Sequence, residues 1–332
     1  MTRVLRVISV PATVTPTTSE MTPANWRDHF LARIGVRRGD HRVPPGLYRL
    51  GAPNADSPVF VSANYSLSFD ALRTSLKGLD GYILVLDTRG INVWCAAGKH
   101  TFGTREIVRR VKSTNLSEVV THRKLILPQL GAPGVAAHEV RKLSGFTVEY
   151  GPVRAVDLPE YLKTHHATPE MRRGNFPLKD RLVLTPVEVT QTLLPMAAAV
   201  GVAFLIGGWV YALAAALVVL SGTVLFPALL PWLPTHDFSS KGFFLGAAVS
   251  VPFILSVLLG HSDWSWYRQL GQSLGFLLAM AASIGYISLN FTGASTYTSR
   301  TGVKKEIYAY IPLMAWSFGI GIIALIVFAF VH

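Results

Sequence analysis

The sequence predicts a Rossmann-like α/β domain followed by an all-α transmembrane domain of five helices. Charge separates the two parts, because residues 1–187 contain 26 of the 31 Lys and Arg residues and 15 of the 19 Asp and Glu residues. In this charged part, short apolar runs alternate with helical patterns, which is typical of a parallel, doubly wound sheet. Residues 188–332 instead contain several apolar stretches of about 20 residues, the length that crosses a bilayer.

The strand candidates of the α/β domain are four apolar runs, residues 59–61, 82–86, 124–127 and 146–150. Helical patterns follow at residues 69–77, 94–99, 104–112 and 134–143. Gly145 is expected to end the last of these helices. A further helix is predicted to begin at Asp157, where Asp-Leu-Pro-Glu has the pattern of a capping box. Residues 1–22 include a Thr/Pro-rich stretch and are predicted to be a flexible lead-in, so the domain is expected over residues 23–187.

Residues 188–332 are expected to form the five spans. No charged residue lies between Glu188 and Asp237, a stretch long enough for two spans. Gly207-Gly208 is the natural place for a hairpin between them. Three more charge-poor runs follow, at residues 242–261, 269–290 and 307–331.

Basic residues predict the orientation of these spans. The loops on one side carry Arg268 alone, whereas the flanks on the other side carry Lys179, Arg181, Lys241, Arg300, Lys304 and Lys305. The positive-inside rule therefore places the α/β domain in the cytoplasm and the spans in the cytoplasmic (inner) membrane. The apolar run at residues 4–10 is short and broken by Arg6, which argues against a signal peptide. The predicted span cores contain no ionisable Asp, Glu, Lys or Arg, which favours anchoring over transport of a charged solute.

Ligands of doubly wound sheets bind at the carboxyl ends of the strands. The loops expected there are residues 62–66, 88–95 and 128–134, and the middle loop ends at Cys95, the only cysteine. A helix N-terminus beside this thiol would favour a thiolate. The alternative is that Cys95 is a small buried hydrophobe. One cysteine forms neither an internal disulfide nor a Cys-based zinc or iron–sulfur site.

The sequence lacks the motifs of several common ligand-binding sites. The chain contains neither GxGxxG nor GxxxxGK[ST]. His165-His166 is interpreted as loop, because adjacent residues do not share a helix face. No nucleic-acid motif accompanies the basic charge, so a nucleic-acid partner is not expected. That charge suits an acidic protein or an anionic bilayer, or is simply a solvated surface.

The octapeptide Asn92-Val-Trp-Cys-Ala-Ala-Gly-Lys99 resembles the signature of the HgcA family, membrane corrinoid proteins that methylate mercury. The resemblance extends over the whole chain, as a corrinoid domain followed by five spans. Residues 64–67 and 122–128 also resemble the corrinoid domain of the large subunit of the corrinoid/iron–sulfur protein, which lacks this cysteine. The DxHxxG motif of common cobalamin domains is absent.

The resemblance implies that Cys95 is the lower ligand of cobalt in cobalamin or a related corrinoid, and that the chain is a methyltransferase that converts Hg(II) to methylmercury. In the HgcA family the octapeptide forms a helix, the cap helix, beneath the corrinoid. We expect Asn92 to be the N-cap residue of this helix, and Ala96, Ala97 and Gly98 to be small so that the corrin ring approaches the backbone. The residues implied to bind the corrinoid are Ser62, Asn64, Tyr65, Ser66, Asn92, Val93, Trp94, Cys95, Ala96, Ala97, Gly98, Lys99, His122, Gln129, Leu130, Gly131 and Gly134.

The resemblance also implies partners. A ferredoxin-like iron–sulfur protein would donate electrons and could carry Hg(II), since no second cysteine is present here. A methylfolate-dependent enzyme would donate the methyl group. Two alternatives remain open: a membrane-bound corrinoid methyl carrier for another acceptor, and a non-catalytic corrinoid-binding or transport protein.

Overall fold

The structure is a computed structural model that describes residues 13–294 and 300–330. The chain divides into two compact units. The first unit runs to Gly174 without residues 33–35, and the second comprises Arg33–Gly35 and Asn175 onward. The boundary therefore lies before the predicted one at residue 187, because α8 (Leu178–Leu182) packs with the helical unit.

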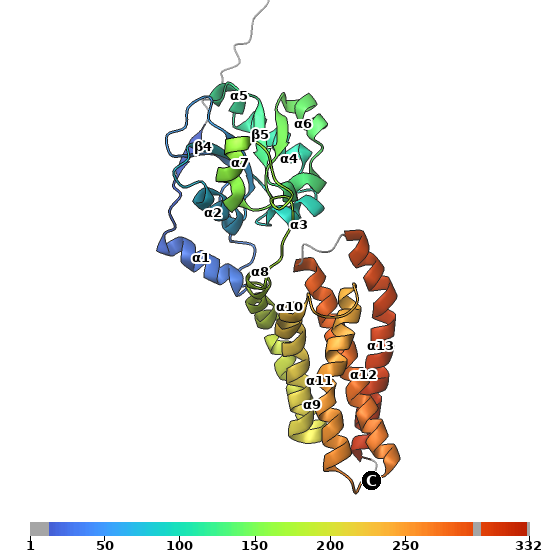
Figure 1. The fold of residues 1–332 in the computed structure, drawn as a ribbon. Helices are drawn as coiled ribbons and strands as arrows, with labels where there is room; N and C mark the ends of the chain where they lie inside the picture. Colours follow the sequence, from blue (N-terminus) through green and yellow to red (C-terminus); the bar gives the residue numbers. More distant parts are fainter. Residues whose placement is uncertain (1–12, 295–299, 331–332) are drawn as a thin grey trace, which may run out of the picture. The chain divides into compact units, whose positions relative to one another are not determined.

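A six-stranded sheet forms the centre of the first unit (Figure 1). Its order is β1-β2-β4-β3-β5-β6, and β4, β3, β5 and β6 are mutually parallel. The chain therefore moves from β3 to β4 on one side and then crosses to β5 on the other. This reversal is the topological switch point at which doubly wound sheets bind ligands. The strands are β1 (Val14–Thr17), β2 (Gly46–Leu50), β3 (Val59–Ala63), β4 (Gly81–Leu86), β5 (Lys124–Leu127) and β6 (Thr147–Tyr150).

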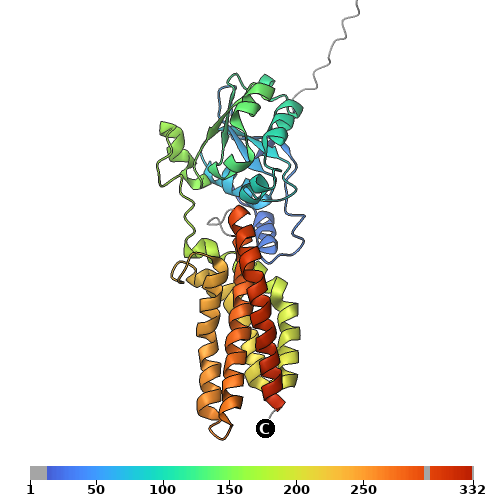
Figure 2. The ribbon, with the colours of Figure 1, turned by 90° about the vertical axis from the view of Figure 1, so that its right-hand side faces the viewer.

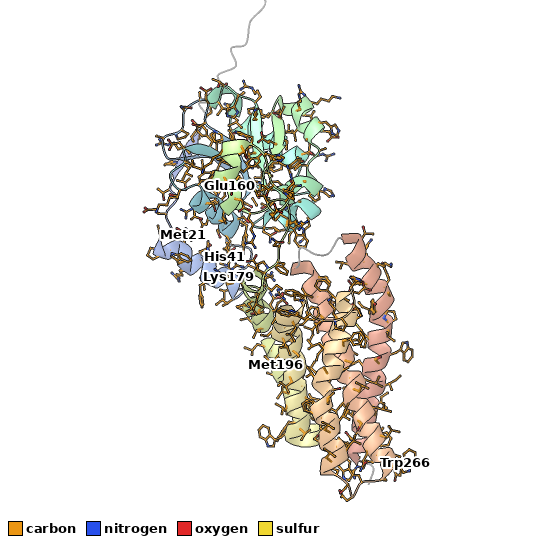
Figure 3. All side chains as sticks on the ribbon, in the orientation of Figure 1. Met21, His41, Glu160, Lys179, Met196 and Trp266 are labelled. Carbon is orange, nitrogen blue, oxygen red and sulfur yellow. The ribbon has the colours of Figure 1, made fainter. Side chains whose placement is uncertain are left out.

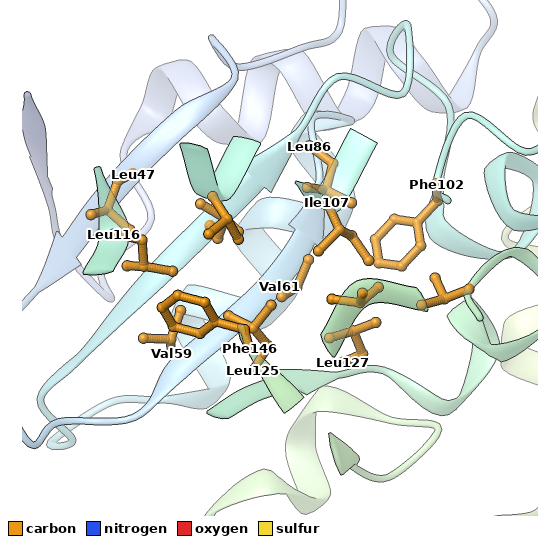
Figure 4. Packing of buried hydrophobic residues seen from close by; sticks show 14 of the residues in the cluster. Leu47, Val59, Val61, Leu86, Phe102, Ile107, Leu116, Leu125, Leu127 and Phe146 are labelled. Carbon is orange, nitrogen blue, oxygen red and sulfur yellow. The ribbon is translucent and has the colours of Figure 1, made fainter. Parts of the chain in front are cut away.

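Helices cover both faces of the sheet, which confirms the doubly wound prediction. On one face, which α4 and α6 cover, Phe102 and Ile107 pack with strand residues (Figure 4). Val140 of α6 belongs to the same buried cluster. On the other face, α2 and α7 bury Phe69, Leu72 and Tyr161. The helices of this unit are α1 (Pro23–Arg33), α2 (Ser66–Ser75), α3 (Val93–Gly98), α4 (Thr104–Ser113), α5 (Leu116–Val119), α6 (Ala137–Ser144) and α7 (Leu158–Thr164). The 3₁₀ turns are η1 (Gln129–Gly134) and η2 (Ala155–Asp157).

Three predictions for this unit need correction. The lead-in is not flexible over its described part, because β1 pairs in parallel with β2, which itself runs antiparallel to β4; residues 1–12 lie outside the described range. The helix predicted from residue 134 begins at Ala137, after η1, although Gly145 ends it with a φ of +78° as expected. Asp157 precedes α7 but its side chain makes no capping bond, since η2 holds Asp157 in helical geometry.

Helix α1 was not predicted, and it attaches to the domain through polar side chains. Asp28 Oδ1 lies 2.7 Å from His41 Nδ1, and Ser66 Oγ donates to Asp28 Oδ2 at 2.5 Å. Next along the helix, His29 Nε2 lies 2.8 Å from Asp70 Oδ2. No residue of α1 is fully buried. The helix is therefore fixed by hydrogen bonds and ion pairs rather than by an apolar stripe.

This attachment should depend on pH through His41 and Asp28. Burial opposes the charged form of each group, but the pKa of His41 is raised by its bonds to Asp28 and the Val36 carbonyl. The pKa of Asp28 is correspondingly lowered by its bonds to Ser66 and His41. The stabilisation is thus complete between about pH 4 and 6.5, the unfolded pKa values of the two groups. It is lost as the pH rises through the raised pKa of His41, or falls through the lowered pKa of Asp28.

We expect the amide protection factors of α1 to fall between pH 6.5 and pH 9, measured by hydrogen exchange on the full chain. His41→Gln should show low protection at both values, because its side chain does not titrate. An equal change with pH in both proteins would contradict this role of His41.

The second unit is a bundle of long apolar helices (Figure 2). Among the described residues, four helical segments are long and apolar enough to cross a membrane, residues 178–229, 238–260, 266–293 and 301–330. Small residues let these helices approach closely, since a side chain at Gly246 would meet the Ala281 backbone at 2.5 Å. The helices are α8, α9 (Thr185–Leu220), α10 (Phe226–Leu229) after a π turn at Ser221–Leu225, α11 (Phe238–Gly260), α12 (Trp266–Asn290) and α13 (Arg300–Phe330), with the 3₁₀ turn Phe291–Ala294 after α12.

The first of these segments reverses direction at Gly207-Gly208, as predicted. Both glycines leave helical geometry, and Gly208 has a φ of +69°. Arg181, before α9, donates hydrogen bonds to the carbonyls of Pro227 and Ala228 at 2.8 Å. Arg181 is separated from Pro227 and Ala228 by 46 and 47 positions in sequence, so these residues meet only if the chain folds back between them. The helical stretches before and after Gly207-Gly208 are therefore antiparallel. The predicted hairpin is confirmed, while the count of five membrane crossings stays a prediction.

The two ends of the bundle differ in charge. Lys179 and Trp266 lie at opposite ends (Figure 3). At the Lys179 end, Arg181 is buried, and Lys241 donates to the carbonyls of Leu230 and Leu233. At the Trp266 end, Arg268 lies over the Trp264 ring. Among the described residues this arrangement agrees with the charge asymmetry from which the orientation was predicted.

Candidate functional site at the carboxyl edge of the sheet

Asn64 joins the ends of β3 and β4. It is 1% exposed, and its Oδ1 accepts hydrogen bonds from the backbone N–H groups of Thr88 and Gly90 at 3.0 Å each. The Thr88 hydroxyl donates to the same oxygen at 2.9 Å. Asn64 therefore shapes the loop that leads into α3, and its amide oxygen faces this loop rather than the rim.

The neighbouring predicted residues are also bonded within the fold. Ser62 is buried in β3, and Ser66 begins α2 with its hydroxyl bonded to Asp28. Tyr65, the N-cap residue of α2, is half-buried. Of the residues predicted from this loop, Tyr65 alone reaches the surface. Ser62, Asn64 and Ser66 instead hold the loop in place.

Helix α3 is a six-residue helix whose two faces differ. Asn92 is its N-cap, and its Oδ1 accepts the backbone N–H of Cys95 at 2.9 Å, as predicted. Ala96 and Ala97 are fully buried in the core, and Val93 packs against it. Trp94 and Cys95 are half-buried, while Gly98 and Lys99 are exposed. The octapeptide thus presents Cys95, with parts of Trp94, Gly98 and Lys99, to the outside.

This division corrects the expected role of the two alanines. Ala96 and Ala97 are small because α3 packs against η1, not because they face a ligand. A side chain at Gly134 would meet the Ala97 Cα and carbonyl oxygen at 3.0 Å, and one at Gly131 would overlap the Phe102 ring. A Cβ at Gly98, by contrast, would meet nothing within 4 Å. Of Gly98, Gly131 and Gly134, Gly98 alone has the open space that close approach of a ligand to the backbone requires.

The segment η1 places the remaining predicted residues beside α3. Leu130 is half-buried, and Gln129 Oε1 accepts a hydrogen bond from Arg172 Nη1 at 2.7 Å. His122 does not belong to this group. It precedes β5, where its Nε2 lies 2.8 Å from the Ser57 carbonyl, whereas η1 follows β5. Because these positions lie at opposite ends of the strand, His122 is at the amino edge of the sheet, and its predicted role at the rim is wrong.

The electrostatics of Cys95 also differ from the prediction. Burial raises the pKa of the Cys95 thiol above its usual value. Lys99, the Asn92 side chain and Arg38 act in the opposite direction but do not overcome burial. The pKa of this thiol is therefore raised, not lowered as predicted. Arg38 was not predicted, because it is 57 positions away from Cys95 in sequence.

No group of three or more His, Cys, Asp or Glu side chains that could hold a metal ion occurs within residues 13–294 and 300–330.

The cap of α3 gives a direct prediction. Asn92→Ala removes the acceptor of the Cys95 N–H and should cost about 1 kcal/mol of stability. It should also raise amide exchange at Cys95, whereas Asn92→Asp, which keeps an oxygen acceptor, should not. Chemical denaturation and hydrogen exchange of the full chain measure both effects. Equal protection of Cys95 in all three proteins would contradict the capping role.

Comparison with known proteins finds relatives of the sheet domain. Residues 37–162 match the family described as the CO dehydrogenase/acetyl-CoA synthase delta subunit. Acetyl-CoA decarbonylase/synthase complex subunit gamma of Methanothermobacter thermautotrophicus is 33% identical over 129 residues, 38% of this chain and 27% of that protein. The subunit gamma of Methanopyrus kandleri is 30% identical over 128 residues, with the same two shares. The corrinoid/iron–sulfur protein large subunit of Moorella thermoacetica is 29% identical over 151 residues, 43% of this chain and 33% of that protein.

The chain thus spans about a third or less of the length of these relatives. The family match begins before β2 and ends within α7, so it contains α3 and η1. The similarity is to proteins named for acetyl-CoA synthesis and for a corrinoid, and it lies in the domain that carries Cys95. The helical unit lies outside the family match.

Proposed function

We propose that the sheet domain binds cobalamin or a related corrinoid at its carboxyl edge, that Cys95 is a ligand of its cobalt, and that the protein transfers a methyl group to Hg(II). One observation carries the proposal. The sole cysteine lies half-buried on a capped helix beside the switch point of a domain similar to the corrinoid/iron–sulfur protein. The choice of Hg(II) as the methyl acceptor follows from the octapeptide's resemblance to the HgcA family.

The residues around Cys95 fit such a group. Thiolate sulfur is a soft, strong donor that suits cobalt. The backbone at Gly98 is open to a flat ligand, with Trp94 and Lys99 beside it. From the neighbouring loops, Tyr65, Gln129 and Leu130 would complete the contact surface. Asn64, Ser66, Gly131 and Gly134 would hold these loops in position.

The raised pKa of Cys95 is compatible with ligation. A thiol that coordinates a metal loses its proton, so cobalt rather than the helix would create the thiolate. Lys99 and Arg38 then favour the negative sulfur over the neutral one. Asn92 fixes the helix turn that carries the sulfur. Without a metal, burial favours the neutral thiol over the thiolate.

When bound, the corrinoid supplies the methyl carrier. If Cys95 binds cobalt, this chain has no second thiol for Hg(II), so mercury would arrive on a partner's cysteines or on a small thiol. A ferredoxin-like iron–sulfur protein would be the electron donor and a possible Hg(II) carrier, and a methylfolate-dependent enzyme the source of the methyl group. Both partners follow from the HgcA resemblance.

The helical unit would place this domain at a membrane. With the hairpin at Gly207-Gly208, the four apolar segments provide five crossings. The basic residues at the Lys179 end then favour the cytoplasmic side of the inner membrane for the sheet domain. The helices would hold the domain beside its partners, which raises their effective concentration.

The test is the absorption spectrum of the full-length protein loaded with cobalamin. We expect bands of an axial ligand that is not nitrogen, together with proton release on loading. Cys95→Ala should retain the corrinoid but lose those bands. If the native protein does not bind cobalamin, the proposed cofactor is refuted. If the native protein and Cys95→Ala give identical spectra, Cys95 is not a ligand of the cobalt. Methyl transfer to other acceptors without methylmercury formation would refute Hg(II) as the substrate.

A further inference from the structure

Helix α1 has an unusual distribution of side chains. Its polar residues Asn25, Asp28 and His29 face the domain, where they bond Arg73, His41 and Asp70. Its aromatic residues face outward, since Trp26 is 62% exposed and Phe30 is 63% exposed. Helices at the surface of soluble domains normally have the reverse arrangement. The two aromatic residues are four positions apart, so they lie next to one another on one side of α1.

Basic residues accompany these aromatic side chains. Arg27 lies between them in sequence, and Arg37 follows the helix; both are exposed. Exposed Val36, at 41%, extends the apolar surface. Aromatic side chains flanked by arginine are the composition of helices that lie in the interface of an anionic bilayer. An acidic protein surface would attract the arginines but would not by itself explain two outward aromatic rings.

The chain directly after α1 is fixed at the start of the first apolar segment. Residues 33–35 belong to the helical unit. There, the Thr190 hydroxyl donates to the Ile34 carbonyl at 2.8 Å. A side chain at Gly35, whose φ is +79°, would meet Val187 at 2.9 Å. These contacts lie beside Glu188, the last charged residue before the uncharged stretch that ends at Asp237.

The position of the end of α1 and the composition of its exposed face both indicate the membrane interface. Glu188 marks the boundary between charged sequence and apolar span, and the end of α1 is held there. Phe30 precedes Ile34 by four residues, which is about 6 Å along a helix. The whole of α1, at about 16 Å, is short enough to remain near that boundary.

From these observations we propose that α1 lies in the membrane interface, with Trp26 and Phe30 inserted among the lipids and Arg27 and Arg37 bound to anionic headgroups. The occupant of the exposed face is the surface of the same bilayer that the helical unit crosses. The proposal does not depend on the corrinoid, because none of these residues belongs to the proposed cobalt site. Apolar burial supplies the anchoring, and attraction between the two arginines and the anionic headgroups strengthens it.

The experiment uses the full-length protein in nanodiscs. A Cys95→Ala background removes the native thiol, and Trp26→Cys then allows a single environment-sensitive fluorophore on the exposed face of α1. The matched control carries the same label at Lys142→Cys, an exposed position on α6. Both proteins must match the unlabelled protein in elution volume and circular dichroism before they are compared.

We expect the label at position 26 to emit at shorter wavelength and to lose most of its emission when the lipids carry a shallow nitroxide quencher. The label at position 142 should show neither effect. Replacing phosphatidylcholine by a mixture with phosphatidylglycerol should increase quenching at position 26, and Arg27→Glu with Arg37→Glu should remove that increase. Equal quenching at positions 26 and 142 would overturn the proposal. Quenching that does not respond to phosphatidylglycerol would overturn the role of the two arginines.

Discussion

Cys95→Ala should abolish methylmercury formation while leaving the fold intact. The side chain is half-buried at the surface of α3, and alanine fits a helix well, so the loss of packing is small. The loss of function should be complete because no second cysteine is present to replace the sulfur donor. The measurement is methylmercury produced by cells that express either protein at equal level, followed by the amount of corrinoid on each purified protein.

Two variants serve as controls for this result. Cys95→Ser has nearly the same size but is a harder, weaker donor, so it should resemble Cys95→Ala. Cys95→His offers a nitrogen ligand and should retain the corrinoid with most activity lost. Normal methylmercury formation by Cys95→Ala would eliminate the thiolate as a cobalt ligand. Loss of folding, seen as a lower melting temperature of the empty protein, would instead assign Cys95 a structural role.

The parallel part of the sheet was predictable because its strands are continuous apolar runs. β3 and β4 are fully buried along their length, and this leaves a clear signal in sequence. β1 and β2 were missed for two different reasons. Arg49 is exposed in β2, and β1, with Thr and Pro, is held at the sheet edge by backbone pairing. β1 is an edge strand and needs little apolar sequence, whereas β2 lies inside the sheet but is only five residues long, and its buried Leu47, Tyr48 and Leu50 do not alternate with polar residues.

The features of the site that were predicted correctly depend on residues close together in sequence, and those that were missed depend on residues far apart. The cap at Asn92 and the hairpin at Gly207-Gly208 are local, and both were found. The burial that raises the pKa of Cys95 arises from packing of residues far apart in sequence. Ala96 and Ala97 show a further limit, because a small residue that packs on η1 and one that faces a ligand look alike in sequence.

The packing of α3 on η1 gives the second large effect. Gly134→Ala should lower both stability and corrinoid retention, because the added Cβ would overlap the Phe102 carbonyl and lie within 3.0 Å of the Ala97 backbone. These neighbours are backbone atoms, so the contact is relieved only by moving η1 away from both α3 and the backbone at Phe102. Overpacking of this kind costs about 1–3 kcal/mol.

Gly98→Ala is the matched control, since its Cβ would meet nothing within 4 Å. In the empty protein it should leave stability unchanged or raise it, by up to about 1 kcal/mol as for Gly to Ala in a helix. If Gly98 faces the corrinoid, however, the same variant should retain less cobalamin despite its stability. Stability and cobalamin retention would then fall together in Gly134→Ala, whereas in Gly98→Ala retention would fall without a loss of stability. Unchanged cobalamin binding in both variants would show that the cap helix does not support the ligand, and would separate Cys95 from the proposed corrinoid site.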